Sequence, residues 1–203
     1  NSKSSCLMEN YQTLIPKMEE VGGVMTTKEL HALGWSNYHI SQMVKKKIIE
    51  RIKRGLYRLV DGYVDQYFET MKIVPEGVIC LFSAALIHDL STFLPQVHQV
   101  SISKERKVSL PNYPPIKLHY WNKSQYSLGI EEVTPYVHPI SIYSKEKTVC
   151  DFVKFRNKVG MDSMKEVLRG YLRLKDRDLS KLLDYAKELH VYSIIDNYLD
   201  VLV

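Results

Sequence analysis

The chain has 203 residues, of which 45% are hydrophobic and 25% charged, and its formal net charge is +5. This suffices for one large domain or two smaller ones with separate cores, and we favour two. The longest apolar run, residues 78–87, is about half the ~20 residues that cross a bilayer, so we expect no membrane span. Residues 1–7 lack the apolar core of a secretion signal, and we leave them out of the fold.

Cysteine usage also narrows the class of protein. Cys6, Cys80 and Cys150 are odd in number and far apart, and none forms a Cys-x-x-Cys pair. Neither a disulfide framework nor a zinc knuckle is therefore expected. We predict a protein of the reducing cytoplasm.

The net charge is concentrated near the N-terminus. Residues 1–60 hold ten basic and five acidic side chains, and the rest of the chain holds 18 of each. A basic N-terminal module followed by a neutral one indicates a nucleic-acid partner for the first and a different partner for the second. We place the domains at residues 8–60 and 61–203.

The first helices and the first strand are predicted from apolar stripes and from residues that cap helices. An apolar stripe at residues 14–21 indicates a helix that Gly22-Gly23 ends, and residues 24–25 suit a short strand. Thr26 and Glu29 then fit a capping box, which starts a helix at Thr27. Gly34 lies where that helix should end, because glycine adopts the left-handed conformation at little cost.

A second helix follows, with Ser36 as its cap. Its inward face carries Ile40, Met43 and Val44, while its outward face is polar. Asparagine and glutamine there can pair with adenine edges, and lysine with phosphate or guanine. We predict that this is a recognition helix.

A basic hairpin comes next. Isoleucines at 48, 49 and 52 indicate a strand, Lys53-Arg54-Gly55 a turn, and residues 56–59 a second strand. Residues 45–58 hold seven basic side chains against Glu50 alone, a net charge of +6. We therefore predict a winged helix that binds double-stranded DNA. The alternative is a small domain whose basic surface contacts protein. The expected DNA contacts are Thr27, Lys28, Ser36, Asn37, Tyr38, Ser41, Gln42, Lys45, Lys46, Arg51, Lys53 and Arg54.

The rest of the chain predicts an α+β domain with a small sheet and C-terminal helices. Helical spacing covers residues 63–74 and 83–90, and the period then changes from about four to two. Alternation predicts strands at 97–103, 116–121 and 130–136, with 140–143 as a further candidate. The last sixty residues return to helical stripes, with candidate N-caps at Ser144, Asp162, Asp178 and Ser193.

Three stretches resemble the AbiEi antitoxins of type IV toxin–antitoxin systems. They are GGVMTTKELHALGWSNYHISQMVKKKIIERIKRGLYRL, ISIYSKEKTVCDFVKFRNKVG and YLRLKDRDLSKLLDYAKEL. The resemblance covers almost the whole chain beyond residue 9. It implies an N-terminal winged helix that represses its own operon at an operator of inverted repeats. It also implies a larger C-terminal domain that opposes a nucleotidyltransferase-like toxin in abortive infection and phage defence, with direct contact to the toxin left open.

Two other hypotheses for the function stay open. Asp89, Glu105 and Lys107 follow the order of a Mg²⁺-dependent nuclease, in which two carboxylates hold the metal and a lysine assists the attacking water. The motif is short and therefore has a high false-positive rate. A plain winged-helix regulator without antitoxin activity is the other alternative. The histidines lack metal-ligand spacing and no phosphate-binding glycine loop is present, so we predict a non-enzyme without a cofactor.

Overall fold

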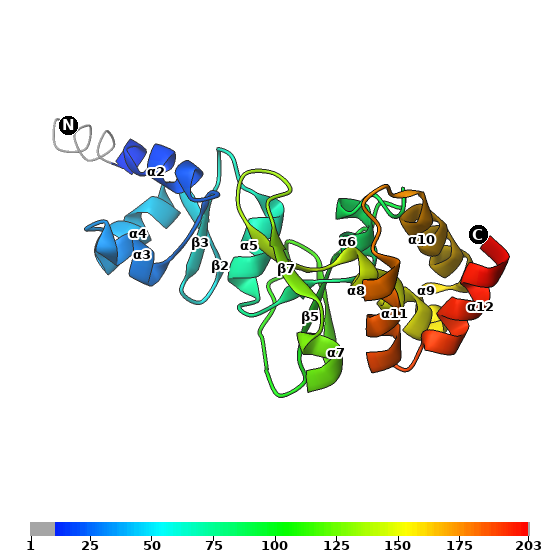
Figure 1. Cartoon of the computed structure of the whole chain (residues 1–203). Helices are drawn as coiled ribbons and strands as arrows, with labels where there is room; N and C mark the ends of the chain where they lie inside the picture. The colour runs from blue at the N-terminus through cyan, green and yellow to red at the C-terminus, as the bar shows by residue number, and fades with distance from the viewer. Residues whose placement is uncertain (1–10, 203) are drawn as a thin grey trace, which may run out of the picture. The chain divides into compact units, whose positions relative to one another are not determined.

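The computed structural model describes residues 11–202 (Figure 1). Residues 1–7, which we left out of the fold, and residues 8–10 of the predicted first domain lie outside this described part. The chain divides into two compact units, Asn1–Pro75 with Val108–Pro115 and Thr134–Pro139, and the remaining residues from Glu76 to Val203. The structure is α+β, as predicted. A functional boundary at residue 60 stays a prediction.

The N-terminal unit contains a helix-turn-helix and a three-stranded sheet with the strand order β1-β3-β2, of which β1 precedes the helix-turn-helix and β2 and β3 follow it. Both sheet pairings are antiparallel. Three helices pack on a core that includes Leu14, Met18, Leu30, Met43 and Ile49. Its elements are α2 (Leu14–Glu20), β1 (Val24–Thr26), α3 (Thr27–Ala32), α4 (Asn37–Lys45), β2 (Ile49–Lys53), β3 (Leu56–Leu59) and α5 (Gln66–Ile73).

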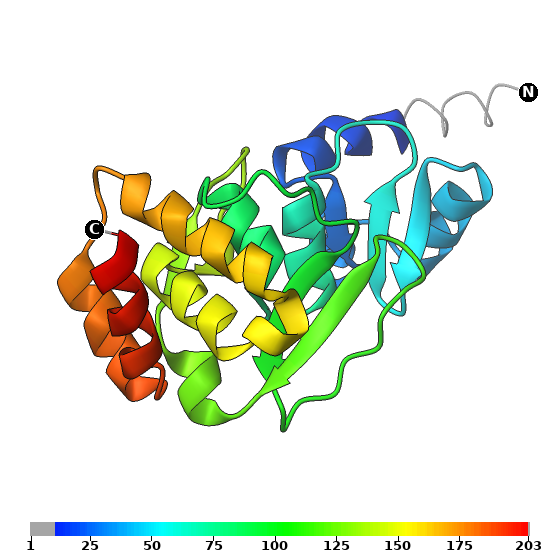
Figure 2. The same cartoon turned by 90° about the vertical axis from the view of Figure 1, so that its right-hand side faces the viewer.

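The second unit is a five-stranded mixed sheet, ordered β6-β5-β4-β8-β7, with helices packed around α8. Figure 2 shows α8 and α10 running beside one another over the sheet. Its strands are β4 (Val78–Ile79), β5 (His98–Ser103), β6 (Ile116–Trp121), β7 (Ile130–Val133) and β8 (Ile140–Tyr143). Its helices are α6 (Leu81–Ile87), α7 (Lys123–Ser127), α8 (Lys145–Lys154), α9 (Arg156–Val159), α10 (Met161–Arg173), α11 (Leu179–Glu188) and α12 (Tyr192–Leu202).

Most predicted elements are present, with shifted ends. Strand β6 has the predicted bounds, whereas β7 stops at Val133 instead of residue 136. The predicted helix over 63–74 begins at Gln66, because Asp65 caps it by accepting from the Phe68 N–H. The helix predicted over 83–90 is α6, which begins two residues earlier, at Leu81. No helix within residues 11–202 combines the length and apolar character needed to cross a membrane.

Two of the four predicted C-terminal caps are correct. Ser144 accepts from the Lys147 N–H, and Asp178 accepts from the Lys181 N–H. Asp162 is wrong as a cap, because α10 begins after Gly160 and places Asp162 in its first turn. There a carboxylate still favours the positive end of the helix dipole. Ser193 is also wrong, since α12 begins at Tyr192.

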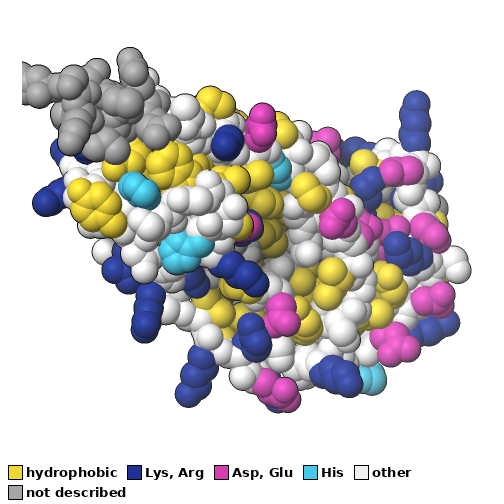
Figure 3. Space-filling view, turned by 90° about the vertical axis from the view of Figure 1, so that its left-hand side faces the viewer, with side chains coloured by type: hydrophobic (Ala, Val, Ile, Leu, Met, Phe, Trp, Pro, Cys, Tyr) yellow, Lys and Arg dark blue, Asp and Glu magenta, His cyan; other side chains and the backbone are white. Residues whose placement is uncertain are grey.

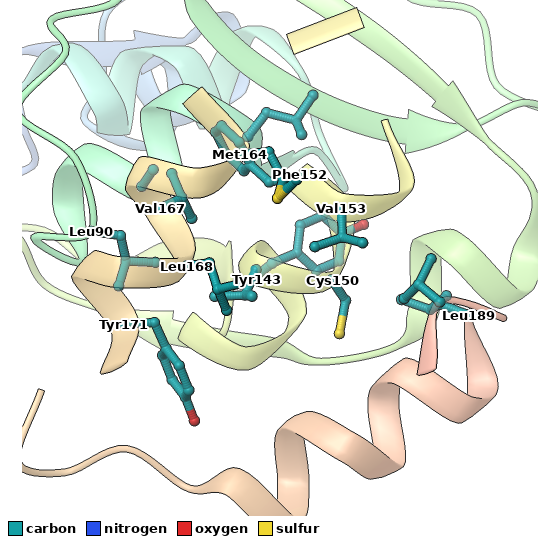
Figure 4. Packing of buried hydrophobic residues seen from close by; sticks show 14 of the residues in the cluster. Leu90, Tyr143, Cys150, Phe152, Val153, Met164, Val167, Leu168, Tyr171 and Leu189 are labelled. Atoms are coloured by element: carbon teal, nitrogen blue, oxygen red, sulfur yellow. The ribbon is translucent and has the colours of Figure 1, made fainter. Parts of the chain in front are cut away.

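A fully buried ion pair lies within the core of the second unit. Figure 4 shows the apolar packing around Tyr143, Cys150 and Val153 in that core. The Lys147 Nζ atom donates to Asp151 Oδ2 at 2.9 Å, and the Gln125 amide donates to Oδ1. The same ammonium lies 3.9 Å from the ring centroid of Tyr143. Burial raises the pKa of Asp151 to about 6, although Lys147 and Gln125 oppose the rise.

Removing one member of this pair should destabilise the second unit strongly. We expect Lys147→Met to lower the free energy of unfolding by about 3–5 kcal/mol, because Asp151 would keep a buried charge without its counter-ion. Lys175→Met, at an exposed position, should change it by less than about 0.5 kcal/mol. Urea denaturation measures both. Lys147→Met combined with Asp151→Leu should recover part of the loss, and a double mutant no more stable than the single one would contradict a penalty from unpaired charge.

Candidate nucleic-acid interface

Both helices of the helix-turn-helix, α3 and the recognition helix α4, begin at N-caps that the sequence predicts. Thr26 and Glu29 form the expected capping box, in which the Glu29 N–H donates to the threonine hydroxyl at 3.1 Å and the Thr26 N–H donates to the glutamate at 2.7 Å. Gly34 has a φ of +89°, so it turns the chain after α3 in the conformation expected of it. The helix α4 then begins at Asn37.

The cap of α4 uses a histidine where a glutamate or glutamine is usual. The His39 N–H donates to the Ser36 hydroxyl at 3.4 Å, and the Ser36 N–H donates to His39 Nδ1 at 3.2 Å. His39 also meets the Trp35 ring edge-on at 5.8 Å between centroids. Ile40 and Met43 are buried beneath the helix. These contacts fix the rotation of α4 and leave its polar face outward.

The wing is the hairpin of β2 and β3. Arg51 pairs with Tyr57 across the two strands, and a bulge follows between Arg51 and Lys53. Gly55 turns the chain with a φ of +78°. Its carbonyl accepts from the Thr27 N–H at 2.9 Å, which ties the turn of the wing to the start of α3.

Helix α5 is joined to the wing by an ion pair between Glu69 and Arg58. Arg58, on β3, donates to Glu50 through Nε at 2.5 Å and to the buried Glu69 through Nη1 at 2.6 Å. Burial raises the pKa of Glu69 even though Arg58 opposes the rise, whereas the two carboxylates raise the pKa of Arg58. These two short bonds, one to each of two carboxylates, support a charged network. Arg58 is therefore a structural residue and not a free cation on the surface.

Two lysines complete this attachment. The Lys53 ammonium donates to the Ile73 carbonyl at 2.6 Å, and burial lowers its pKa. Lys72, on α5, pairs with Glu29 of α3 at 2.6 Å. Burial alone would raise the pKa of Glu29, but the bonds from Lys72 and Thr26 lower it. Helix α5 is thus bonded to both the wing and the helix-turn-helix.

A groove of about 420 Å³ lies between α4 and the wing, and we call it the helix–wing groove. Its helix side presents polar groups one turn apart, and its wing side presents a cation and an aromatic ring. The groove is open enough to admit a ligand edge and carries no carboxylate in its lining. Its lining residues are Asn37, Ile40, Ser41, Val44, Lys45, Arg51 and Tyr57.

The structure brings four of the twelve predicted contacts together on this groove: Asn37, Ser41, Lys45 and Arg51. The Asn37 amide oxygen is 2.9 Å from His31 Nε2, so it is held in place by α3. Sequence reasoning missed Tyr57 and Val44. Counting through the hairpin turn from the Lys53–Leu56 pair would place Tyr57 opposite Ile52, and the bulge between Arg51 and Lys53 brings it opposite Arg51 instead.

The other eight predicted residues do not line the groove. Tyr38, Lys28 and Arg54 are exposed, and Gln42 and Thr27 are half-buried. Figure 3 shows several Lys and Arg side chains projecting from the protein surface. Lys46 lies over the Tyr11 ring at 5.0 Å, and its ammonium remains exposed. Ser36 and Lys53 are engaged within the fold by the cap and by the Ile73 carbonyl.

The residues of the nuclease alternative occupy surface turns of the second unit. Asp89, with a φ of +57°, follows α6. Glu105 lines a hollow of about 370 Å³ beside Arg106, and Asp89 is not in that lining. Arg106 itself pairs with Glu76 at 3.1 Å. Within residues 11–202, no three His, Cys, Asp or Glu side chains are grouped so that they could hold a metal ion.

Comparison with known proteins agrees with the resemblance over the winged helix. Residues 18–60 match the model of a family described as transcriptional regulators, AbiEi antitoxins. The match begins in α2 and ends just after β3, so it spans the helix-turn-helix and the wing. None of the curated proteins searched matches the chain.

Ser36 and Ser41 have different roles: Ser36 caps α4, whereas Ser41 lines the helix–wing groove. We expect Ser36→Ala to lower the free energy of unfolding by about 0.5–2 kcal/mol, because the His39 N–H loses its acceptor at the start of α4. Ser41→Ala, on the same helix and exposed, should change it by less than about 0.5 kcal/mol. Thermal unfolding of the two variants is the measurement. Equal stability of both would mean that the cap does not hold the helix.

Proposed function

We propose that this protein is a DNA-binding transcriptional repressor of its own operon and the antitoxin of a nucleotidyltransferase-like toxin. The observation that carries the proposal is the helix–wing groove, whose polar and basic groups lie within the segment that matches the AbiEi regulator family. The proposal assigns no catalytic chemistry to the chain, and it places the protein in the cytoplasm.

The winged helix has the parts that duplex recognition needs. Helix α4 is nine residues long and carries exposed Asn37 and Ser41 on the side that faces the wing. A helix of this kind enters the major groove and reads base edges, while side chains beside it hold phosphates. Arg51 and Arg54 supply positive charge from the wing. Lys45, Lys46 and Lys47 add charge where α4 ends.

The antitoxin half rests on different support. The family description names both a regulator and an antitoxin, and the matched residues cover only the winged helix. We assign opposition to the toxin to residues 61–203, because the second unit has a core of its own and the winged helix accounts for DNA binding. The proposal covers opposition to the toxin by direct contact as well as by an indirect effect.

Base reading and phosphate binding should respond differently to mutation. Asn37→Ala should reduce the preference for the operator over random duplex by about 1–3 kcal/mol if the amide makes a bidentate base contact, and Gln42→Ala should do the same. Arg54→Ala should weaken both duplexes nearly equally. With about four to six phosphates neutralised by each protomer, the logarithm of affinity should fall against the logarithm of salt concentration with a slope of roughly −4 to −5.

Fluorescence anisotropy with the two duplexes at several salt concentrations measures these effects. Lys175→Glu with Lys187→Glu is the matched control, because it changes charge at exposed positions outside the winged helix. Uniform loss in the α4 variants would make this helix a phosphate contact. Affinity independent of salt would remove the wing from the DNA.

Repression and antitoxin activity should separate in the full-length protein. Arg51→Glu with Arg54→Glu should abolish repression, because the wing would repel phosphate, and should leave rescue from the cognate toxin largely intact. Both side chains are exposed, so the fold should persist. We avoid Lys53 because its ammonium bonds to Ile73. A promoter–reporter assay and a toxin co-expression assay measure the two activities. Loss of both in a variant with native circular dichroism would show that rescue depends on DNA binding.

A further inference from the structure

A hollow of about 190 Å³ opens in the second unit at strand β6, which forms one edge of the five-stranded sheet. One side is a wall of aromatic rings. Trp121 and Phe155 are stacked, with centroids 5.5 Å apart and planes 12° apart, and Phe82 of α6 lines the hollow beside them. Ligand pockets for whole drug-sized molecules measure about 300–1,000 Å³, so this one suits a single ring system.

Two polar side chains are also part of the lining. His119 Nε2 and Gln99 Oε1 are 3.1 Å apart, and both residues line the hollow. Burial, together with Lys117 and Lys158, lowers the pKa of His119 to about 4, so the ring is neutral at pH 7. An amide oxygen only accepts, and Nε2 therefore carries the proton. This leaves His119 Nδ1 as an acceptor.

The amide nitrogen of Gln99 is the matching donor. Gln99 is only 9% exposed, and its side-chain oxygen is the atom that meets His119. The remaining side-chain amide group carries two N–H donors. The lining thus includes a donor group on Gln99 and an acceptor on His119, together with aromatic rings. The edge of a nucleobase has the complementary pattern.

The charge of the lining is positive. Lys117 and Lys158 line the hollow and are exposed, and the lining holds no carboxylate. Lys158 lies 5.7 Å from the centroid of the Phe155 ring, which places its ammonium beside the aromatic wall. Within residues 11–202 neither lysine forms a salt bridge. Two unpaired ammonium groups next to a ring-sized hollow suit an anion joined to an aromatic ring.

We propose that this hollow binds a nucleoside phosphate, with the base against Trp121 and Phe155, its edge on Gln99 and His119, and the phosphate at Lys117 and Lys158. The ligand is either a free mononucleotide or an unpaired nucleotide of a single strand, which share this chemistry. The site lies wholly in the second unit and is independent of the winged helix.

Isothermal titration calorimetry of the full-length protein tests the proposal. Adenosine and uridine 5′-monophosphate are the probes, with ribose 5-phosphate and adenosine as ligands that lack the base or the phosphate. We expect one nucleotide per chain, bound at least about tenfold more tightly than either partial ligand. Equal affinity for ribose 5-phosphate would reduce the site to an anion patch. No heat at millimolar nucleotide would overturn it.

Variants assign the binding to the hollow. Lys117→Glu with Lys158→Glu should weaken nucleotide binding by about tenfold or more, while the control pair Lys175→Glu with Lys187→Glu should not. His119→Phe keeps a ring but removes the acceptor, and it should change the preference between adenine and uracil. Val159→Phe narrows the hollow and should weaken both nucleotides. Unchanged affinity in the lysine variant, with native circular dichroism, would place the nucleotide elsewhere.

A last comparison separates the two sources of the ligand. A single-stranded pentanucleotide with a terminal phosphate should bind the Arg51→Glu, Arg54→Glu variant more tightly than the mononucleotide does if a strand is the natural ligand. Tighter binding of the mononucleotide would identify the free form. Operator binding by the Lys117→Glu, Lys158→Glu variant should remain native, so failure here and failure of the repressor proposal have different signatures.

Discussion

The arrangement of the N-terminal unit depends on the ion pair between Arg58 and Glu69. Glu69 is 2% exposed, and a carboxylate at that depth requires a partner. Arg58 supplies it with a bond of 2.6 Å from the middle of the wing, and its guanidinium also lies 5.1 Å from the Tyr113 ring centroid. The wing is therefore anchored to α5 at its centre, and its exposed cations stand on a fixed support. A site that reads base edges needs such a support, because small displacements break bidentate contacts.

This anchoring explains why charge counted along the sequence overstates the charge offered to a partner. Residues 45–58 have a net charge of +6, but Arg58 neutralises carboxylates of its own unit and Lys53 bonds to a backbone carbonyl. Sequence spacing cannot distinguish Lys53 from Arg54, since they are neighbours where β2 ends and the turn begins. The distinction comes from Ile73, which lies 20 residues later and which the fold brings beneath the wing.

The parts of the fold that local chemistry determines could be predicted. The capping box of Thr26 and Glu29, the left-handed Gly34 and the bounds of β6 all follow from residues within a few positions of one another. The parts that were missed depend on distant partners or on very short elements. Strand β4 has two residues and is hidden in an apolar run that continues into α6. It is a strand because it pairs with β5 on one side and β8 on the other. The helix–wing groove was half predicted, because the helix periodicity identified Asn37 and Ser41 but not the wing residue Tyr57 that faces them.

The charges beyond residue 60 cancel overall, but they are unevenly distributed and leave one local region positive. Eighteen basic and 18 acidic residues cancel over that stretch, which by itself argues against an anionic partner. Exposed charges act mainly within a Debye length, about 10 Å at ordinary ionic strength, so the local set decides what a hollow attracts. At strand β6 that set is Lys117 and Lys158 with a neutral His119 beside Trp121. Burial is the main cause of the low pKa of His119, and the two lysines lower it further because they disfavour a third cation. The neutral unit therefore carries a locally positive hollow, and the proposed ligand, an anion that bears a hydrogen-bonding ring, matches both this field and the polar groups of Gln99 and His119.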